Sequence, residues 1–308
     1  MAADPLSDAL AHIDARCVIS GGFSIGGAWG LSVWPQARLK LIAVVLGSCW
    51  LTADGVQNPL RLEEGDVAVL NDRQVVALAS DPALEPTDRT DLFEDNPGAV
   101  VRIGDDQEVL VLGGHIDVNR GGEDLLLTAL PPAMHIRASG AEAPAVRWLL
   151  DRLAQEMASL RPGATAAAQQ YAQLLFVEVL RSHLAESVAL PPGWIRVLAD
   201  ERLAPALRLM HADPGRPWHL DDLARSAAMS RTTFAARFKS TAGVPPLTYL
   251  HQWRMRLAMR ALREEDVQVS SLAASLGYSS ESAFSHAFKR TTGIAPRRYR
   301  VLSTTPES

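Results

Sequence analysis

The stretch "SESAFSHAFKRTTGIAPRRY" (residues 280–299) repeats, with changes, the stretch "SRTTFAARFKSTAGVPPLTY" (residues 230–249) that lies fifty residues earlier. Eight of the twenty paired positions are identical. Serine, two phenylalanines, glycine, proline and tyrosine stand at offsets 0, 4, 8, 13, 16 and 19 in both copies. A pattern that recurs at matched offsets indicates two copies of one structural unit.

Each shared position predicts a local structure. Ser230 and Ser280 suit the N-terminus of a helix, because a serine oxygen accepts from the backbone N–H groups of the first turn. The phenylalanines at offsets 4 and 8 fall on one face of the helix that follows. The glycine suits a helix end with positive φ, and the proline suits the start of the next segment. A short helix upstream of each serine, "LDDLARSAA" or "VSSLAASL", completes a helix-turn-helix pattern.

The faces turned away from the phenylalanines are predicted to differ between the copies. At 100° per residue, offsets 2, 5, 6 and 9 point outward. A small polar surface that ends in a lysine can enter the major groove of DNA, although these positions can equally be ordinary solvent-facing residues. With their neighbours, the predicted DNA contacts are Ser230, Arg231, Thr232, Ala235, Ala236 and Lys239 in copy one, and Ser280, Glu281, Ser282, Ser285, His286, Lys289 and Arg290 in copy two.

The distribution of charge supports a polyanion-binding module at the C-terminus. Residues 214–302 hold 14 Lys and Arg against 6 Asp and Glu, whereas residues 1–213 hold 16 against 28. The chain as a whole has a net charge of −5. A basic block on an acidic protein favours contact with a polyanion, although a solvated surface of Arg-rich helices is the alternative.

The segment 246–266 between the copies predicts a helix of about 20 residues that spans about 30 Å, close to the 34 Å repeat of the major groove.

These residues resemble the DNA-binding domain of the AraC/XylS transcription regulators. The resemblance runs from "LDDLARSAAMSRTTFAARFKS" to "ESAFSHAFKRTTGIAPRRYR". It implies an all-α domain at 213–302 with helix-turn-helix units at about 220–241 and 270–292, which binds promoter DNA as a double strand. It also implies contact with RNA polymerase, and activation rather than repression.

Residues 17 to about 120 predict a small barrel or sandwich of short strands, because apolar runs such as "LKLIAVVL" and "EVLVLGG" alternate with turn residues. Two amphipathic helical patterns follow, at 146–160 and 171–184. Stretches such as "AWGLSVWP" (28–35) and "LRLEEGDVAVL" (60–70) resemble cupin-type sensor domains. The resemblance implies an α+β chain with a cupin-like β-barrel at 1–135 and a helical dimerisation and linker segment at 136–212, and therefore a homodimer.

A small-molecule effector is favoured over a metal in the sensor. The β region holds only His115 and lacks the histidine-rich strand pair of metal-binding cupins, so no metal and no other cofactor is expected. An effector pocket needs apolar walls and a few polar contacts, although the tryptophans can instead be barrel core. The candidate pocket residues are Trp29, Trp34 and Trp50 as walls, with Arg38 and His115 as polar contacts.

The remaining signals bear on compartment and on rival functions. No apolar run is long enough to span a membrane, no signal-peptide pattern opens the chain, and two cysteines fit a reducing cytosol. We therefore predict a cytoplasmic, ligand-responsive transcription regulator that is not an enzyme. Two alternatives stay open. One is a redox-responsive regulator acting through Cys17 and Cys49, which requires an exposed thiol of lowered pKa. The other is a cupin-like enzyme fused to a DNA-binding domain.

Overall fold

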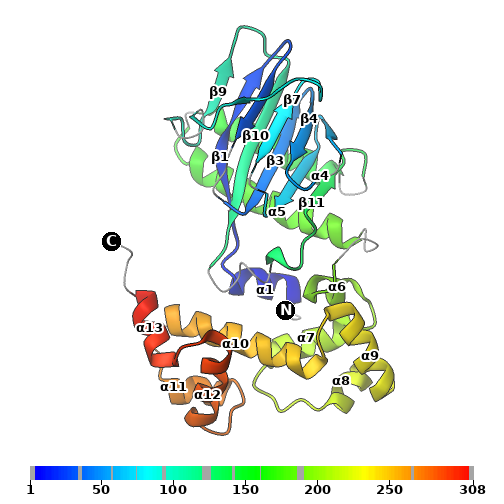
Figure 1. The fold of residues 1–308 in the computed structure, drawn as a ribbon, viewed down its shortest axis with the longest axis vertical. Helices are drawn as coiled ribbons and strands as arrows, with labels where there is room; N and C mark the ends of the chain where they lie inside the picture. Colours follow the sequence, from blue (N-terminus) through cyan, green and yellow to red (C-terminus); the bar gives the residue numbers. More distant parts are fainter. Residues whose placement is uncertain are drawn as a thin grey trace. The chain divides into compact units, whose positions relative to one another are not determined.

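The computed structural model describes residues 4–33, 37–56, 58–73, 75–91, 95–119, 126–140, 143–159, 161–185, 191–264 and 267–304. The chain divides into two compact units (Figure 1). The β unit consists of Arg16–Asp117 and Leu130–Ala189. The helical unit consists of Met1–Ala15, Val118–Ala129 and Leu190–Ser308. No helix of the described residues is long and apolar enough to cross a membrane.

The β unit is built from two sheets. One has six strands in the order β11-β6-β3-β10-β1-β9, and the other has five in the order β5-β4-β7-β2-β8. The strands are β1 (Arg16–Ile25), β2 (Gly30–Val33), β3 (Leu39–Leu46), β4 (Ser48–Ala53), β5 (Leu60–Glu63), β6 (Val67–Asn71), β7 (Val76–Ala79), β8 (Thr87–Asp88), β9 (Val100–Ile103), β10 (Val109–Asp117) and β11 (Ala133–Ile136).

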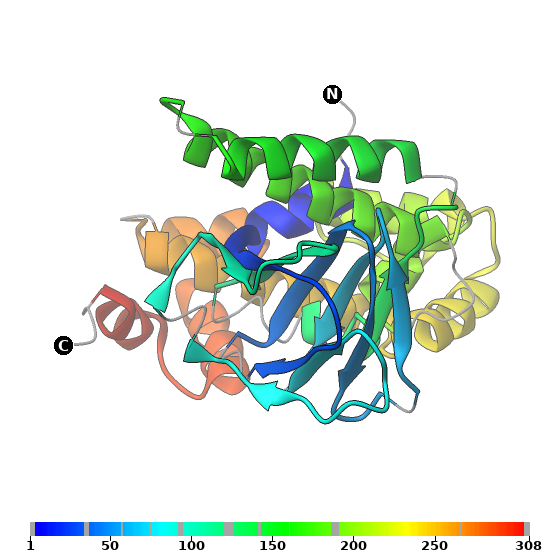
Figure 2. The same ribbon diagram turned by 90° about the horizontal axis from the view of Figure 1, so that it is seen from above.

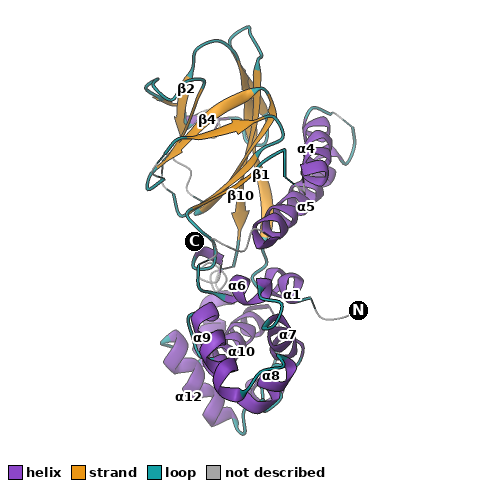
Figure 3. Ribbon diagram, turned by 90° about the vertical axis from the view of Figure 1, so that its right-hand side faces the viewer, coloured by secondary structure: helices purple, strands orange, loops and turns teal. Residues whose placement is uncertain are grey.

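The two sheets enclose one apolar core, to which both contribute alternate residues of their strands. In β3, for example, Ile42 and Val44 belong to this core, so Leu41 and Ala43 face the other side of the sheet, where they are also buried. That other side is covered by α4 (Ala143–Met157) and α5 (Ala164–Ala185), which contact β1, β3 and β11 (Figures 2 and 3). The predicted α+β fold with a small cupin-like barrel is confirmed.

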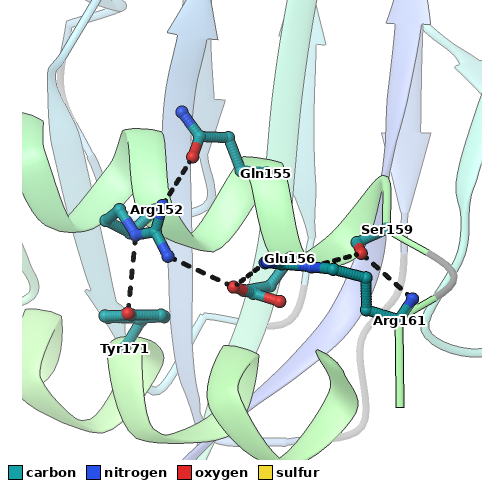
Figure 4. A network of polar contacts seen from close by, with 6 residues as sticks. All are labelled: Arg152, Gln155, Glu156, Ser159, Arg161 and Tyr171. Atoms are coloured by element: carbon teal, nitrogen blue, oxygen red, sulfur yellow. Dashed lines mark hydrogen bonds and ion pairs between the residues drawn. The ribbon is translucent and has the colours of Figure 1, made fainter. Parts of the chain in front are cut away.

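A polar network fixes the connection between α4 and α5 (Figure 4). The buried Glu156 accepts hydrogen bonds from Arg152 at 3.3 Å and from Arg161 at 2.7 Å. Arg152 also donates to the hydroxyl of Tyr171 on α5 at 3.5 Å. A buried carboxylate is unfavourable unless it is paired, so the two arginines stabilise this helical hairpin.

The helical unit holds the two copies of the repeat at opposite ends of one long helix, α10 (Figure 1). Its C-terminal part joins α11, α12 and α13 in one apolar core, whereas α9 packs near its start. The helices after α5 are α6 (Trp194–Ala199), α7 (Ala204–Ala212), α8 (Leu220–Ser226), α9 (Arg231–Ala242), α10 (Pro246–Glu264), α11 (Val269–Ser275), α12 (Glu281–Thr292) and α13 (Pro296–Thr304).

The N-terminal helix, α1 (Pro5–His12), also folds with the helical unit, where it packs against α6, α7 and α10. The N-terminal range of 1–135 that the sequence assigns to the sensor therefore contains two segments, up to Ala15 and Val118–Ala129, that belong to the helical unit. The physical reason is an amphipathic helix whose Leu6, Ala9 and Leu10 are buried.

Candidate nucleic-acid interface

The two copies of the repeated sequence form the same capped helix, α9 in one copy and α12 in the other. The Oγ of Ser230 accepts from the backbone N–H three residues later at 3.2 Å, and the Oγ of Ser280 does so at 3.1 Å. Both helices end on a glycine, Gly243 or Gly293, with φ 79° and ψ −16°. A proline opens the helix that follows in each copy. The predicted start and end of both helices are confirmed.

Buried aromatic rings hold α9 and α12 in place. The repeated phenylalanines have no exposed surface in either copy, as predicted. The tyrosine at offset 19, for which the sequence suggested no role, packs edge-on against the second phenylalanine of its own copy. The ring centroids are 5.8 Å apart in copy one and 5.3 Å apart in copy two. The phenylalanines are Phe234, Phe238, Phe284 and Phe288.

The turns before the two helices have different residues at the left-handed position. Ala228 has φ 51° in copy one, a left-handed conformation that a residue with a Cβ adopts at a cost. Gly277, in the turn of copy two, has φ 78°. A Cβ at Gly277 would lie 2.1 Å from the carbonyl oxygen of Gly215, so this turn also needs glycine for close approach of two backbones.

The outward faces of α9 and α12 combine the same scaffold with different side chains. In each helix, the predicted positions at offsets 2, 6 and 9 are exposed, and the position at offset 5 is half-buried. The exposed side chains are those of Thr232, Ala236 and Lys239 on α9, and those of Ser282, His286 and Lys289 on α12. The structure thus places two different sets of side chains on two equivalent helices, and the α12 set has more hydrogen-bonding groups.

Several charged residues near these faces also contact the protein itself. Arg231 lies 3.8 Å from a carboxylate oxygen of Asp221, and Glu281 lies 3.4 Å from Arg297, both in exposed ion pairs. Arg290 is exposed near the end of α12. Exposed pairs of this kind are weak and can yield to a phosphate.

Two arginines of α10 form hydrogen bonds within the helical unit. Arg254 is half-buried and donates to the carbonyl oxygens of Pro214 at 2.6 Å and Arg216 at 2.8 Å. Arg263 donates to the hydroxyl of Tyr299 at 3.3 Å. These two arginines therefore tie α10 to its neighbours in the helical unit.

Two of the residues predicted to line an effector pocket, Arg38 and Trp50, lie away from the barrel interior. Trp29 is buried in the barrel core, where it packs edge-on against Phe23 at 5.5 Å between ring centroids. Trp50 alternates with two core residues along β4, which puts its side chain on the opposite face of the sheet. Arg38 is exposed and ion-paired to a carboxylate at 2.8 Å. Trp34 lies outside the described residues.

His115, the fifth predicted pocket residue, is half-buried near the end of β10. Its Nδ1 lies 2.9 Å from the Oγ of Ser20, and its Nε2 lies 3.3 Å from a carboxylate oxygen of Asp117. No group of three His, Cys, Asp or Glu side chains within the described ranges is arranged to hold a metal ion.

Both cysteines are buried and unpaired as thiols. Burial raises the pKa of Cys17 to about 12, and the nearby charge of Asp117 adds to this effect. Burial alone raises the pKa of Cys49, which belongs to the barrel core, to about 12. A redox sensor needs the opposite environment, an accessible thiol with a lowered pKa.

Comparison with known proteins covers both parts of the chain. The family model described as Cupin matches residues 4–185, and the one described as Helix-turn-helix domain matches residues 223–301. A putative AraC-like transcription regulator of Streptomyces lividans is 39% identical over 303 residues, 98% of this chain and 100% of that protein. The transcriptional regulator AlkR of Acinetobacter baylyi is 31% identical, over 90% of this chain and 92% of that protein. The DNA-binding domain of AdpA, solved in complex with a target DNA, is 32% identical over 33% of this chain and 93% of that chain, with a TM-score of 0.32.

Proposed function

This chain belongs to the AraC-like transcription regulators and is therefore a DNA-binding transcription regulator. We propose that it is a cytoplasmic activator that responds to a small-molecule effector. The proposed mode of DNA binding rests on the outward faces of α9 and α12. The two faces share one scaffold and sit at opposite ends of α10, which has 19 residues and is therefore about 28 Å long. Two reading helices so mounted enter successive major grooves on one side of DNA.

The two faces divide the work of recognition. On α12, Ser282, Ser285 and His286 offer donors and acceptors to base edges, so this helix specifies sequence by hydrogen bonding. On α9, Ala235 and Ala236 offer only methyl groups, which suit the methyl group of thymine and close approach to the backbone. The side chains of the flanking residues Ser230, Arg231, Thr232, Ser280 and Arg290 help to position the helices at the phosphates. Glu281, whose carboxylate a phosphate repels, suits instead a base donor such as the amino group of cytosine.

Salt dependence of binding tests the two lysines as phosphate contacts. Lys239→Gln and Lys289→Gln should each weaken binding of the full chain to DNA, and each should reduce the slope of log K against log salt by about 1. Arg61→Gln is the control, because Arg61 is also an exposed cation and lies on β5 of the β unit. An unchanged slope in both lysine variants would show that another face of the protein binds the DNA.

The proposed homodimer forms through an apolar patch on the outer side of α4 and α5. Trp148 is 56% exposed and Leu174 is 50% exposed. Tyr171 connects the two, because it packs edge-on against Trp148 at 5.9 Å and lies one helical turn before Leu174. Large exposed apolar side chains that adjoin on a rigid helical hairpin are typical of a protein interface, and we assign this one to a second copy of the chain.

The mass of the protein in solution tests the dimer. The wild type should have about twice the chain mass of 33.3 kDa by light scattering. Trp148→Glu should halve that mass, because it puts a charge in the centre of the patch. Val100→Glu is the control, since Val100 is an exposed apolar residue on β9, outside the patch. A Trp148→Glu variant that stays dimeric would show that the dimer interface lies elsewhere.

The remaining parts of the proposal follow from the family. Bound at a promoter, the protein contacts RNA polymerase and activates transcription when its effector is present. The barrel acts as a sensor and not as an enzyme, which agrees with the naming of the relatives as regulators. An effector changes the output only if it binds the active and inactive states with different affinity.

A further inference from the structure

Lys40 is a buried cation that faces the interior of the barrel. The residue is only 4% exposed. It stands two residues before Ile42 on β3, so the two side chains point to the same side of the strand, and Ile42 belongs to the barrel core. The pairing of β3 with β6 also indicates that Lys40 faces the interior, because Lys40 is opposite Leu70, another core residue.

The charge of Lys40 lacks a direct partner among the residues that the structure describes. The two carboxylates that act on it from a distance are those of Asp54 and Asp72. Asp72 is engaged by Arg38, at 2.8 and 3.1 Å, and an oxygen of Asp54 accepts from the backbone N–H of Val75 at 2.9 Å. Burial lowers the pKa of Lys40, the nearby charge of Arg73 lowers it further, and the two carboxylates only partly offset these effects. A buried ammonium group without an ion pair is unfavourable in the free protein.

Two further polar side chains lie beside this cation. His115 of β10 is directly opposite Lys40 in the pairing of β10 with β3, so it also faces the interior. The Oγ of Ser20, from the neighbouring strand β1, lies 2.9 Å from the His115 ring. The carboxylate of Asp117 contacts the far nitrogen of that ring, but its side chain is 61% exposed. Lys40, His115 and Ser20 thus stand on three adjacent strands of one sheet, β3, β10 and β1, whose order can be followed in Figure 1.

Open space adjoins these polar groups on the interior side. Gly113 lies two residues before His115 on β10 and is paired with Ile42, so a side chain there would point into the barrel. A Cβ at Gly113 would meet no described atom within 4 Å. At the next residue, Gly114, whose Cβ would point to the other face, the carbonyl oxygen of Val18 would be only 2.6 Å away. The space in front of Gly113 is therefore bounded by apolar core on one side and by the polar groups on the other.

We propose that this end of the barrel binds an organic monocarboxylate with an apolar body. The carboxylate pairs with the ammonium group of Lys40 and accepts hydrogen bonds from the neighbouring polar groups, while the apolar body occupies the space in front of Gly113. One buried cation matches one negative charge, and the core residues that bound the space favour hydrocarbon. The inference rests on the proposed effector response and names the chemical class of that effector. It also replaces Arg38 by Lys40 as the cationic contact.

Titration of the full chain with matched acids and alcohols tests the charge. The probes are octanoate beside 1-octanol, and benzoate beside benzyl alcohol. The wild type should bind at least one acid about tenfold more tightly than its alcohol, because only the acid gains a charge-assisted contact. Lys40→Met should abolish this preference, and Gly113→Leu should abolish binding of both acid and alcohol by filling the space. Arg38→Gln, which removes an exposed cation nearby, should leave the preference unchanged.

Three results would overturn the inference: no preference of the wild type for either acid, a preference that survives in Lys40→Met, or a preference lost in Arg38→Gln. DNA binding of each variant is measured in parallel, since none of these changes touches α9 or α12. A wild type that fails to bind DNA would defeat the proposed function itself. A wild type that binds DNA but does not distinguish acids from alcohols would defeat only the assignment of the effector class. Thermal unfolding of each variant shows that the barrel remains folded.

Discussion

The thiols of Cys17 and Cys49 should be almost inert towards disulfide reagents in the folded protein. Burial raises the pKa of each from the ordinary value of 9.0 to about 12. At pH 8 an ordinary thiol is about one-tenth thiolate, whereas a thiol with a pKa of 12 is only about one part in ten thousand thiolate. The reactive species is therefore about a thousandfold scarcer, before any hindrance to access is counted.

The assay is the rate of reaction with an aromatic disulfide at pH 8, followed with and without denaturant. The folded protein should react at least about a thousandfold more slowly than the same chain unfolded in guanidinium, in which both thiols should react. Cys17→Ser and Cys49→Ser assign any residual rate to one thiol. A folded protein that reacts as fast as the unfolded chain would show that its thiols are accessible and readily ionised, and it would favour the redox-responsive regulator. If the double serine variant lost its response to effector but kept DNA binding, the thiols would be part of the signal.

Two further predictions concern stability. Ala228→Gly should raise the free energy of unfolding in urea by about 0.5–1 kcal/mol, because removing the strain of a left-handed alanine outweighs the greater chain entropy of glycine in the unfolded state. Gly277→Ala should lower that free energy by about 3 kcal/mol or more, because its Cβ would clash with the carbonyl oxygen of Gly215. Equal effects of the two changes would contradict the assigned geometry of the turns. Lys40→Met should stabilise the free protein by about 1–2 kcal/mol, because it removes a buried charge that has no direct ion pair among the described residues. A loss of stability in that variant would mean that the ammonium group is satisfied in the free barrel.

The helical unit was largely predictable because its information is local. Caps, helix faces and glycine ends depend on residues within about twenty positions, and a pattern that occurs twice supports its own interpretation. The serine caps and the buried phenylalanines followed from offsets alone.

The sensor was less predictable because its site depends on strand register and on contacts between distant segments. Trp50 and Cys49 are neighbours in sequence, yet only Cys49 faces the core, and a shift of one residue would exchange them. Likewise, no local pattern shows that α1 folds with the C-terminal helices. One local signal does bear on the site. Lys40 is the only lysine in the first 238 residues, and it interrupts the apolar run "LKLIAVVL".

We propose that α9 and α12 read different bases within one half-site of DNA. Selection of bound sequences from a pool of random duplexes by the full chain tests this proposal. The wild type should enrich a motif with two conserved blocks about one helical turn apart, because each helix occupies one major groove. His286→Ala should relax or change the preference in one block and leave the other intact. Enrichment of no motif would contradict sequence-specific binding. A His286→Ala variant that selects the wild-type motif unchanged in both blocks would show that α12 does not read bases through His286.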